Sequence, residues 1–223
     1  MDWGKTEYFT LLASLPAMPR DFKEPPLPIS EPRLRNRLGM LTSEDARILR
    51  QLETFLRWER QPREQTDADF ARVYERIQAE LDNPLCREIV EFLMDIRFLT
   101  AAQRCRRQGQ SPMPCLGRWG PHIRSHWDAP GFGLLARFPW LDTLEQHWDE
   151  QQVMAAEQLL TEVMWNFLLQ LTDRYYFDFE AVMVYLARWD IINNWLSHDP
   201  EEGRQRFDEL TEEALGEYVA IFD

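Results

Sequence analysis

Cysteine is scarce in this sequence, and no hydrophobic run approaches the length of a membrane span. The three cysteines, Cys86, Cys105 and Cys115, are odd in number and form no CxxC pair. A disulfide framework is therefore not expected, and a reducing cytosol is the simpler inference. The apolar run at 9–15 is too short for a signal peptide and far shorter than the ~20 residues of a membrane span. We expect a soluble chain without direct membrane insertion.

Recognisable catalytic motifs are also missing. GxSxG, GxxxxGK[ST] and GxGxxG do not occur, and the nearest glycine pair is Gly131 and Gly133. The Glu-x-x-His pattern of di-iron helix bundles is absent as well, since Trp148 stands three residues after Glu145. The sequence therefore predicts a protein that is not an enzyme and binds no cofactor.

Basic residues are outnumbered by acidic ones. The chain has 25 Lys and Arg against 38 Asp and Glu, a net charge of −13, which argues against nucleic-acid binding because a phosphate backbone would be repelled. The charge is uneven: residues 86–137 hold eight Arg and four acids, whereas 199–223 hold nine acids and two Arg. This asymmetry favours oriented docking on a protein partner, with two solvated helix faces as the other interpretation.

Apolar side chains are plentiful and recur at helical spacing. They make up 44% of the chain, with nine Trp and thirteen Phe, enough to build a core without disulfides or metal. Thr42 with Asp45 resembles a capping box, and Asn83 before Pro84 is typical of a helix start. No alternation of strands and helices is visible. The pattern predicts an all-α bundle of about six helices, over 42–62, 66–82, 83–109, 142–173, 179–196 and from 199 onward.

The first 41 residues are expected to form an irregular arm packed on the body. The prolines from Pro16 to Pro32 should prevent any helix after the first apolar run. Tyr8 and Leu11 are among the side chains that should anchor the start of the arm, either as a strand or as a single helical turn.

A second irregular stretch is expected in the middle of the chain. Residues 110–141 are rich in Gly and Pro and contain several Trp, which predicts a long loop that packs on something. Residues 42–223 should then form a single helical domain. The alternative is two sub-bundles, 42–109 and 142–223, joined by this loop.

Four side chains in and near that loop could in principle hold zinc: Cys105, Cys115, His122 and His126. Zinc fingers need closely paired ligands at both ends, whereas these cysteines are ten residues apart and only the histidines are close. We expect no metal here and interpret the four as packing or hydrogen-bonding residues. An enzyme with a metal site near Cys115, His122 and His126 remains the rival hypothesis.

Arginine and tryptophan side chains are the candidates for contact with a partner, because these residues dominate binding hot spots. The Arg cluster near 104–107 could meet a partner or a phosphate, but cations at a helix end also complement the helix dipole. The Trp residues of the loop could be interface anchors or core. The candidates are Arg104, Arg106, Arg107, Trp119, Arg124 and Trp127.

Three stretches resemble a bacterial family encoded in V-type (A/V-type) ATPase operons, at the place where the gene for the central-stalk C subunit is expected. The first is YFTLLASLP with PPLPISEPRLRNRLGMLTSEDARIL. The second, EFLMDIRFLTAAQRCRRQGQSP, is similar to a helix of the C subunit with an Arg-rich end, and the third is ARWDIINNWLSHDP. Two features depart from the C subunit: Arg97 stands where Asn is common, and the Trp-rich loop has no clear counterpart.

The resemblance implies a helical funnel on the cytoplasmic side of the membrane rotor ring, where it receives the foot of the central stalk. Such a part acts by protein contacts alone and has no catalytic residue or cofactor. Its partners would be the rotor ring and the other proteins of the central stalk, and it would be cytoplasmic, held at the inner membrane by the complex. An assembly factor for the same ATPase is the alternative.

Overall fold

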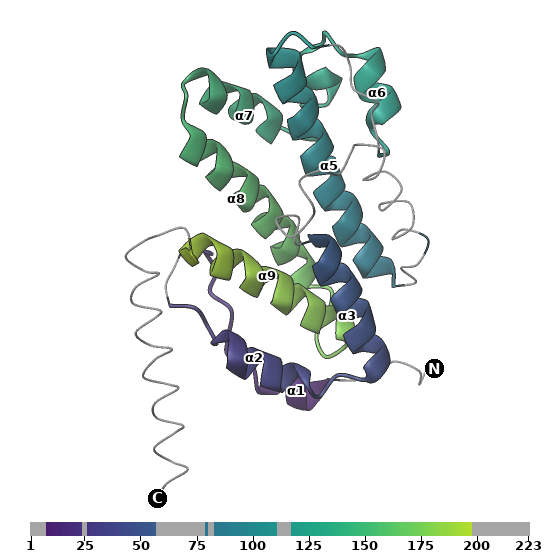
Figure 1. Ribbon diagram of the computed structural model, residues 1–223, viewed down its shortest axis with the longest axis vertical. Coiled ribbons are helices and arrows are strands. Elements are labelled where there is room, and N and C mark those ends of the chain that lie inside the picture. Colours follow the sequence, from purple (N-terminus) through teal and green to yellow (C-terminus); the bar gives the residue numbers. More distant parts are fainter. Residues whose placement is uncertain (1–7, 24–25, 57–78, 80–82, 111–116, 198–223) are drawn as a thin grey trace, which may run out of the picture. The chain divides into compact units, whose positions relative to one another are not determined.

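The structure, a computed structural model, describes residues 8–23, 26–56, 79, 83–110 and 117–197. All regular elements in these ranges are helical, which confirms the predicted all-α fold (Figure 1). Three predicted features lie outside these ranges: the helix expected at 66–82, of which only residue 79 is described, the helix expected from 199, and Cys115. The elements are α1 (Phe9–Ala13), α2 (Glu31–Leu38), α3 (Ser43–Leu56), α5 (Pro84–Arg107), α6 (Gly120–Ser125), the 3-10 helix η2 (Pro130–Gly133), α7 (Trp140–Asp149), α8 (Val153–Thr172) and α9 (Phe179–Ser197).

The chain divides into two compact units. Unit 1 consists of Met1–Ala46 and Trp165–Asp223, and unit 2 of Arg47–Met164, so that the boundaries fall inside α3 and α8. In this division the arm shares a unit with α9, and α7 shares one with α5. None of the helices in the described ranges combines the length and apolarity that crossing a bilayer requires.

Tyr8 anchors the start of unit 1. α1 is a single short helix, as one of the two alternatives for the arm predicted, and its Leu11 is buried. The buried phenol of Tyr8 accepts the N–H of Thr42 (3.1 Å) and donates to the Asp45 carboxylate. Thr42 Oγ1 in turn accepts the N–H of Asp45 (3.2 Å). The predicted capping signal at α3 is therefore confirmed, with a phenol from the arm added to it.

The prolines do not exclude helix from the whole arm, so this expectation is wrong for α2. Pro32 lies in the first turn of α2, where a backbone N–H has no acceptor within the helix in any case. The helix follows normally, since Leu34 N donates to Ser30 O (2.9 Å) and the Leu34 side chain is buried.

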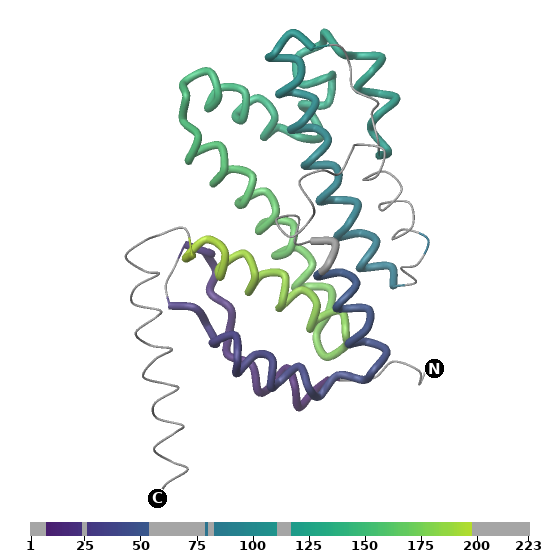
Figure 2. The backbone as a smooth tube through the Cα atoms, viewed as in Figure 1, coloured from purple at the N-terminus to yellow at the C-terminus, as the bar shows by residue number. Residues whose placement is uncertain are grey.

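Between α1 and α2 the chain runs along α9 and returns (Figure 2). On the outward path Tyr185 of α9 binds the carbonyl of Pro16, and farther along Phe22 packs against Trp195 near the end of α9. On the return path Trp189 binds the carbonyl of Ile29. We call the described residues 14–23 and 26–30 the strap.

α5 is the longest described helix, and both of its ends follow the sequence signals. The Asn83 side chain accepts the N–H groups of Leu85 (2.9 Å) and Cys86 (3.1 Å), which are two of the unpaired donors of the first turn. At the other end Gly109 has a φ of 67°, and Gln110 N donates to Cys105 O (3.0 Å). This is a Schellman motif, which favours glycine at the left-handed position.

The predicted central loop is partly helical, so a continuous loop over 110–141 is wrong. α6 and η2 interrupt it, and Ile123 and Phe132 are fully buried. Both belong to a core with side chains from α5 and α7 that supplies the packing expected for this stretch. The buried members are Leu99, Ala102, Ile123, Phe132, Leu134, Phe138 and Leu141.

The long helix predicted from 142 to about 173 is in fact two helices, α7 and α8. Gln151 takes a left-handed φ of 59° although it is not glycine. Gln152 N donates to His147 O (2.8 Å) and Gln151 N to Trp148 O (3.2 Å), which again is a Schellman motif. The predicted break near 173–178 is confirmed, since α8 ends at Thr172 and α9 begins at Phe179.

Candidate protein-interaction surface

All six predicted contact residues lie in unit 2, but some of them are engaged in contacts within that unit while others are exposed. Arg104, Arg106 and Arg107 occupy the last turn of α5. Trp119 and Arg124 lie at the start and in the body of α6, and Trp127 lies in the turn that follows.

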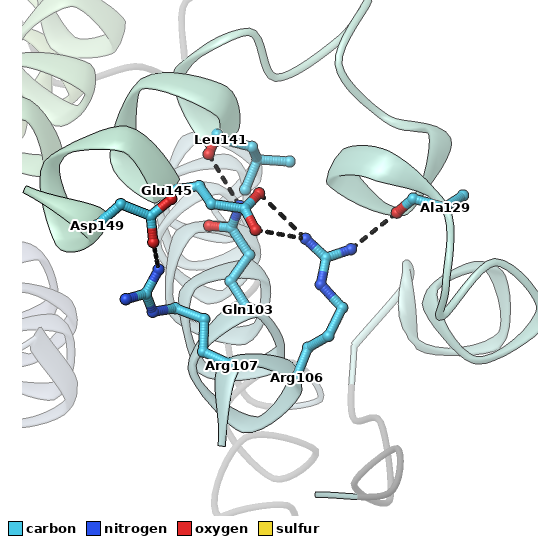
Figure 3. Close-up of polar contacts among 7 residues, drawn as sticks. All are labelled: Gln103, Arg106, Arg107, Ala129, Leu141, Glu145 and Asp149. Atoms are coloured by element: carbon cyan, nitrogen blue, oxygen red, sulfur yellow. Dashed lines mark hydrogen bonds and ion pairs between the residues drawn. The ribbon is translucent and has the colours of Figure 1, made fainter. Parts of the chain in front are cut away.

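Arg106 is fixed by groups of its own unit (Figure 3). One terminal nitrogen donates to Ala129 O (2.8 Å), and the other reaches both carboxylate oxygens of Glu145 on α7 (3.2 Å each). Its guanidinium also lies over the Phe132 ring, 4.7 Å from the centroid. The side chain is only 19% exposed. Arg106 therefore joins α5 to η2 and α7, and it is poorly placed to meet a partner.

Two further polar contacts hold the end of α5 against α7. The buried amide of Gln103 donates to Leu141 O (2.8 Å), in the first turn of α7. One turn farther along α5, Arg107 forms an ion pair with Asp149, the last residue of α7 (Figure 3). Because these contacts are spread along the length of α7, they restrain it at both ends.

Arg104 and Arg107 are both exposed, but Arg107 is engaged in the ion pair with Asp149, which leaves Arg104 the more available of the two. The guanidinium of Arg104 lies 5.8 Å from the ring centroid of Trp148 on α7. Arg107 approaches the same ring at 5.9 Å. A half-buried indole flanked by two guanidinium groups combines the residue types that dominate protein interfaces.

Trp119 forms a second cluster of arginine and aromatic groups. Its ring meets Phe138 edge-on at 5.5 Å, while Arg118 and Arg137 lie 5.8 and 5.5 Å from its centroid. The buried Nε1 of Trp119 has no hydrogen-bond partner among the described residues. Leaving such a donor unpaired costs about 1–3 kcal/mol. Trp119 is thus mainly a packing residue with one face near two cations.

Arg118 is held by two acidic residues of α5. Its Nε lies 3.0 Å from Asp95 Oδ2, and its Nη1 lies 3.2 Å from Glu91 Oε2. Asp95 is buried, so Arg118 compensates a charge that would otherwise be costly. The arginine excess of residues 86–137 is therefore partly neutralised inside unit 2.

Trp127 and Arg124 complete the set. Trp127 is half-buried and packs on Phe132 with ring centroids 5.5 Å apart, so it belongs to the core as much as to the surface. Arg124 is exposed on α6. Arg104 and Arg124 are consequently the two predicted contact arginines that are most available to a partner.

The histidines do not form a metal centre with other described residues. His122 Nε2 lies 3.0 Å from Phe132 O, and His126 Nδ1 lies 3.0 Å from His122 O. The two rings are stacked, with centroids 4.1 Å apart. Within the described ranges no group of three or more His, Cys, Asp or Glu is placed to bind a metal ion. Cys115 lies outside those ranges, and Cys105 is buried.

Sequence reasoning missed Trp148 and Glu145 as parts of this surface. Glu145 and Asp149 are four residues apart and share one face of α7, which is a signal for two cations on a neighbouring element. Their partners lie 39 and 42 residues away in sequence, however. No local pattern could have paired them.

The fold and this surface define an all-α protein whose unit 2 presents arginine and tryptophan side chains held in place by internal ion pairs. The chain belongs to a family described as protein of unknown function (DUF2764), whose model matches residues 50–215. No curated protein and no solved structure matches the chain.

Proposed function

We propose that this chain is a non-catalytic component of a V-type ATPase that couples the central stalk to the membrane rotor ring. In this role it contributes to ATP-driven or ATP-synthesising ion transport and acts by protein contacts alone. It is cytoplasmic and peripheral to the inner membrane through the complex. The observation that carries the proposal is the resemblance of three stretches to the C subunit of these enzymes and to the family encoded in its place. Two of them form much of α5 and α9.

The geometry of α5 supports a mechanical role. The Arg-rich end of α5 is the part that resembles the C subunit, and three side chains, Gln103, Arg106 and Arg107, fasten it to α7 (Figure 3). A part that transmits torque between two partners needs contact residues on rigid elements, because a loose surface would absorb the motion. Arg104 and Trp148 stand on such an element pair.

The negative net charge of −13 supports protein partners over nucleic acid. Exposed arginines on a predominantly acidic protein give it surfaces of opposite character, which favours oriented docking. Under this proposal the Arg104 region faces an acidic surface of one ATPase partner. An assembly factor for the same enzyme would use the same contacts but would leave the finished complex.

Affinity purification of the tagged chain from its own organism under mild lysis tests the proposal. A stalk component should be recovered with the ring and stalk proteins in a fixed stoichiometry. An assembly factor should be recovered only with incomplete complexes. Recovery of the native protein free of any part of the ATPase would contradict both.

Charge reversal of the accessible arginines sharpens this test. The double variant Arg104→Glu, Arg124→Glu should reduce recovery of the partners without unfolding the chain, because both side chains are exposed. Arg37→Glu, at an exposed position of α2 in unit 1, reverses an arginine elsewhere and should leave recovery unchanged. Arg106 and Arg107 are unsuitable for this purpose, since reversing them breaks the junction of α5 and α7.

A further inference from the structure

The strap is held by side chains that donate hydrogen bonds to its backbone carbonyls. Tyr185 Oη donates to Pro16 O (3.1 Å) and Arg188 Nη2 to Pro19 O (2.8 Å). Trp165 Nε1 on α8 donates to Arg20 O (3.0 Å) and Trp189 Nε1 to Ile29 O (2.8 Å). All of these groups belong to unit 1. A phenol, a guanidinium and the indole of Trp165 are thus directed at the outward path of the strap, and the indole of Trp189 at its return path.

The strap has the composition of a polyproline II ligand. Pro16 and Pro19 are three residues apart, the repeat of that helix, so their carbonyls lie on one side of the segment. Proline fixes φ near −65°, and Met18 is restricted to extended conformations because it precedes a proline. Segments of the form PxxP are bound in other proteins by grooves lined with aromatic side chains.

Burying the charged guanidinium of Arg188 is unfavourable, and its hydrogen bond to the strap compensates part of this penalty. Arg188 is buried, and its guanidinium lies 4.5 Å from the ring centroid of Trp165. Its Nε has no hydrogen-bond partner in the described part of the chain. Burial lowers the pKa of this group, which reflects the penalty on its charge. The polar contact that Nη2 makes is the one to the strap.

Phe22 is the side-chain anchor of the strap. It is 1% exposed and packs between two indoles, at 5.7 Å from Trp165 and 5.0 Å from Trp195. The remaining polar contacts are made to carbonyl groups, which every residue carries. These contacts therefore select a segment with one aromatic side chain at the position of Phe22, and prolines favour such a segment because they hold its backbone extended before it binds.

We propose that the surface formed by Tyr185, Arg188 and Trp195 of α9 with Trp165 of α8 is a recognition site for a proline-rich segment of another polypeptide. The chain's own strap occupies this site as an internal ligand and blocks it. A partner segment of the same chemistry gains access when the strap leaves.

The strap has an advantage over any partner because it is tethered. A tethered ligand acts at an effective concentration in the millimolar range, so a free peptide of equal intrinsic affinity competes poorly. Binding in trans should therefore be seen once the strap is weakened. The site differs from the Arg104 surface of unit 2, and the inference does not depend on the ATPase proposal.

The test uses the full chain with Phe22→Ala and a fluorescein-labelled peptide of residues 14–23, SLPAMPRDFK. The substitution removes the anchor from the strap and leaves a space that the phenylalanine of the peptide fills. Fluorescence anisotropy should show at least tenfold tighter binding to the variant than to the wild-type chain. A peptide with alanine in place of that phenylalanine should not show this gain.

A second substitution shows where the peptide binds. Adding Tyr185→Phe to the Phe22→Ala chain removes the hydroxyl group that binds the Pro16 carbonyl and should weaken binding of the peptide severalfold. If Phe22→Ala does not fold, Phe22→Leu replaces it, because leucine weakens the same anchor and leaves less of the space between Trp165 and Trp195 empty. The proposal is overturned if a folded variant binds the peptide no better than the wild-type chain. It is equally overturned if the alanine peptide binds as well as the phenylalanine peptide.

Discussion

Gln151 offers a sharp test of the backbone geometry, because it takes the left-handed position of a Schellman motif that glycine takes at the end of α5. At both helix ends the same pair of hydrogen bonds closes the motif. Gly109 has a φ of 67° and Gln151 a φ of 59°. The two sites therefore differ mainly in whether a Cβ atom is present.

The magnitudes follow from this difference. A left-handed conformation costs an L-residue about 1–2 kcal/mol, whereas glycine adopts it freely. Glycine also raises the conformational entropy of the unfolded chain, which reduces the gain in folding stability by about 0.4–1 kcal/mol. Gln151→Gly should therefore stabilise unit 2 by about 1 kcal/mol. Gly109→Ala should destabilise it by a similar amount, since nothing within 4 Å of the added Cβ would clash and the backbone conformation alone is responsible.

Urea unfolding followed by circular dichroism measures both changes, and thermal melting should show shifts of about 2–4 °C in opposite directions. Gln151→Ala is the matched control. It shortens an exposed side chain but keeps the Cβ atom, so its stability should stay close to that of the wild-type chain. A loss of stability in Gln151→Gly, or a gain equal to it in Gln151→Ala, would refute the explanation from the left-handed backbone.

Three further predictions concern caps, charges and pH. Asn83→Ala should cost about 1 kcal/mol in urea unfolding, because two N–H groups of α5 lose their acceptor, while Asn83→Asp should retain most of the stability. Glu145→Gln should cost about 1–2 kcal/mol, since the partly exposed ion pair with Arg106 is lost, and a double-mutant cycle with Arg106→Gln should show coupling between the two. Burial raises the pKa of Tyr185 from 10.0 to about 12, so the folded chain keeps a proton that the unfolded chain releases. The linked stability is complete below pH 10 and is lost as the pH rises through 12, and unfolding midpoints should fall less steeply in that window for Tyr185→Phe.

Helix boundaries that are set by local chemistry are predictable from the sequence. Thr42 and Asn83 are recognisable as caps because a short polar side chain satisfies N–H groups two or three residues away. Gly109 is recognisable as a helix end because glycine adopts the left-handed conformation of a Schellman motif without strain. Gln151 is not, because glutamine has no preference for the left-handed conformation and the break depends on where α7 and α8 each pack. Pro32 led to the opposite error: it predicted that no helix would form, but a proline in the first turn is compatible with a helix.

The sequence predicts which residue types lie on the candidate surface, but it does not predict which of these side chains are engaged in contacts within the fold. Arginine and tryptophan in residues 104–127 mark a region rich in both residue types, and its contact with a partner stays a prediction. Whether an arginine is accessible or engaged depends on residues far away in sequence, as with Arg106 and Glu145. The strap shows the same limit, since Arg188 gives no local sign that its partner is Pro19, 169 residues away.

The contacts of the strap have a consequence for the order in which the chain folds during synthesis. The strap and its partners on α8 and α9 are 145–169 residues apart in sequence. At a synthesis rate of about 5–20 residues per second, Phe22 is made roughly 10–35 seconds before Trp195. Unit 2, which is the continuous stretch Arg47–Met164, does not face this delay.

We therefore expect the middle of the chain to become protease-resistant on the ribosome before the arm does. Stalled chains of increasing length can show this, because cleavage within 16–22 should persist until α9 has emerged. Protection of the arm before that point would mean that it finds another partner first. Until α9 appears, the Phe22 side chain, which is 1% exposed in the folded chain, lacks the indole of Trp195 and stays accessible to solvent and to chaperones.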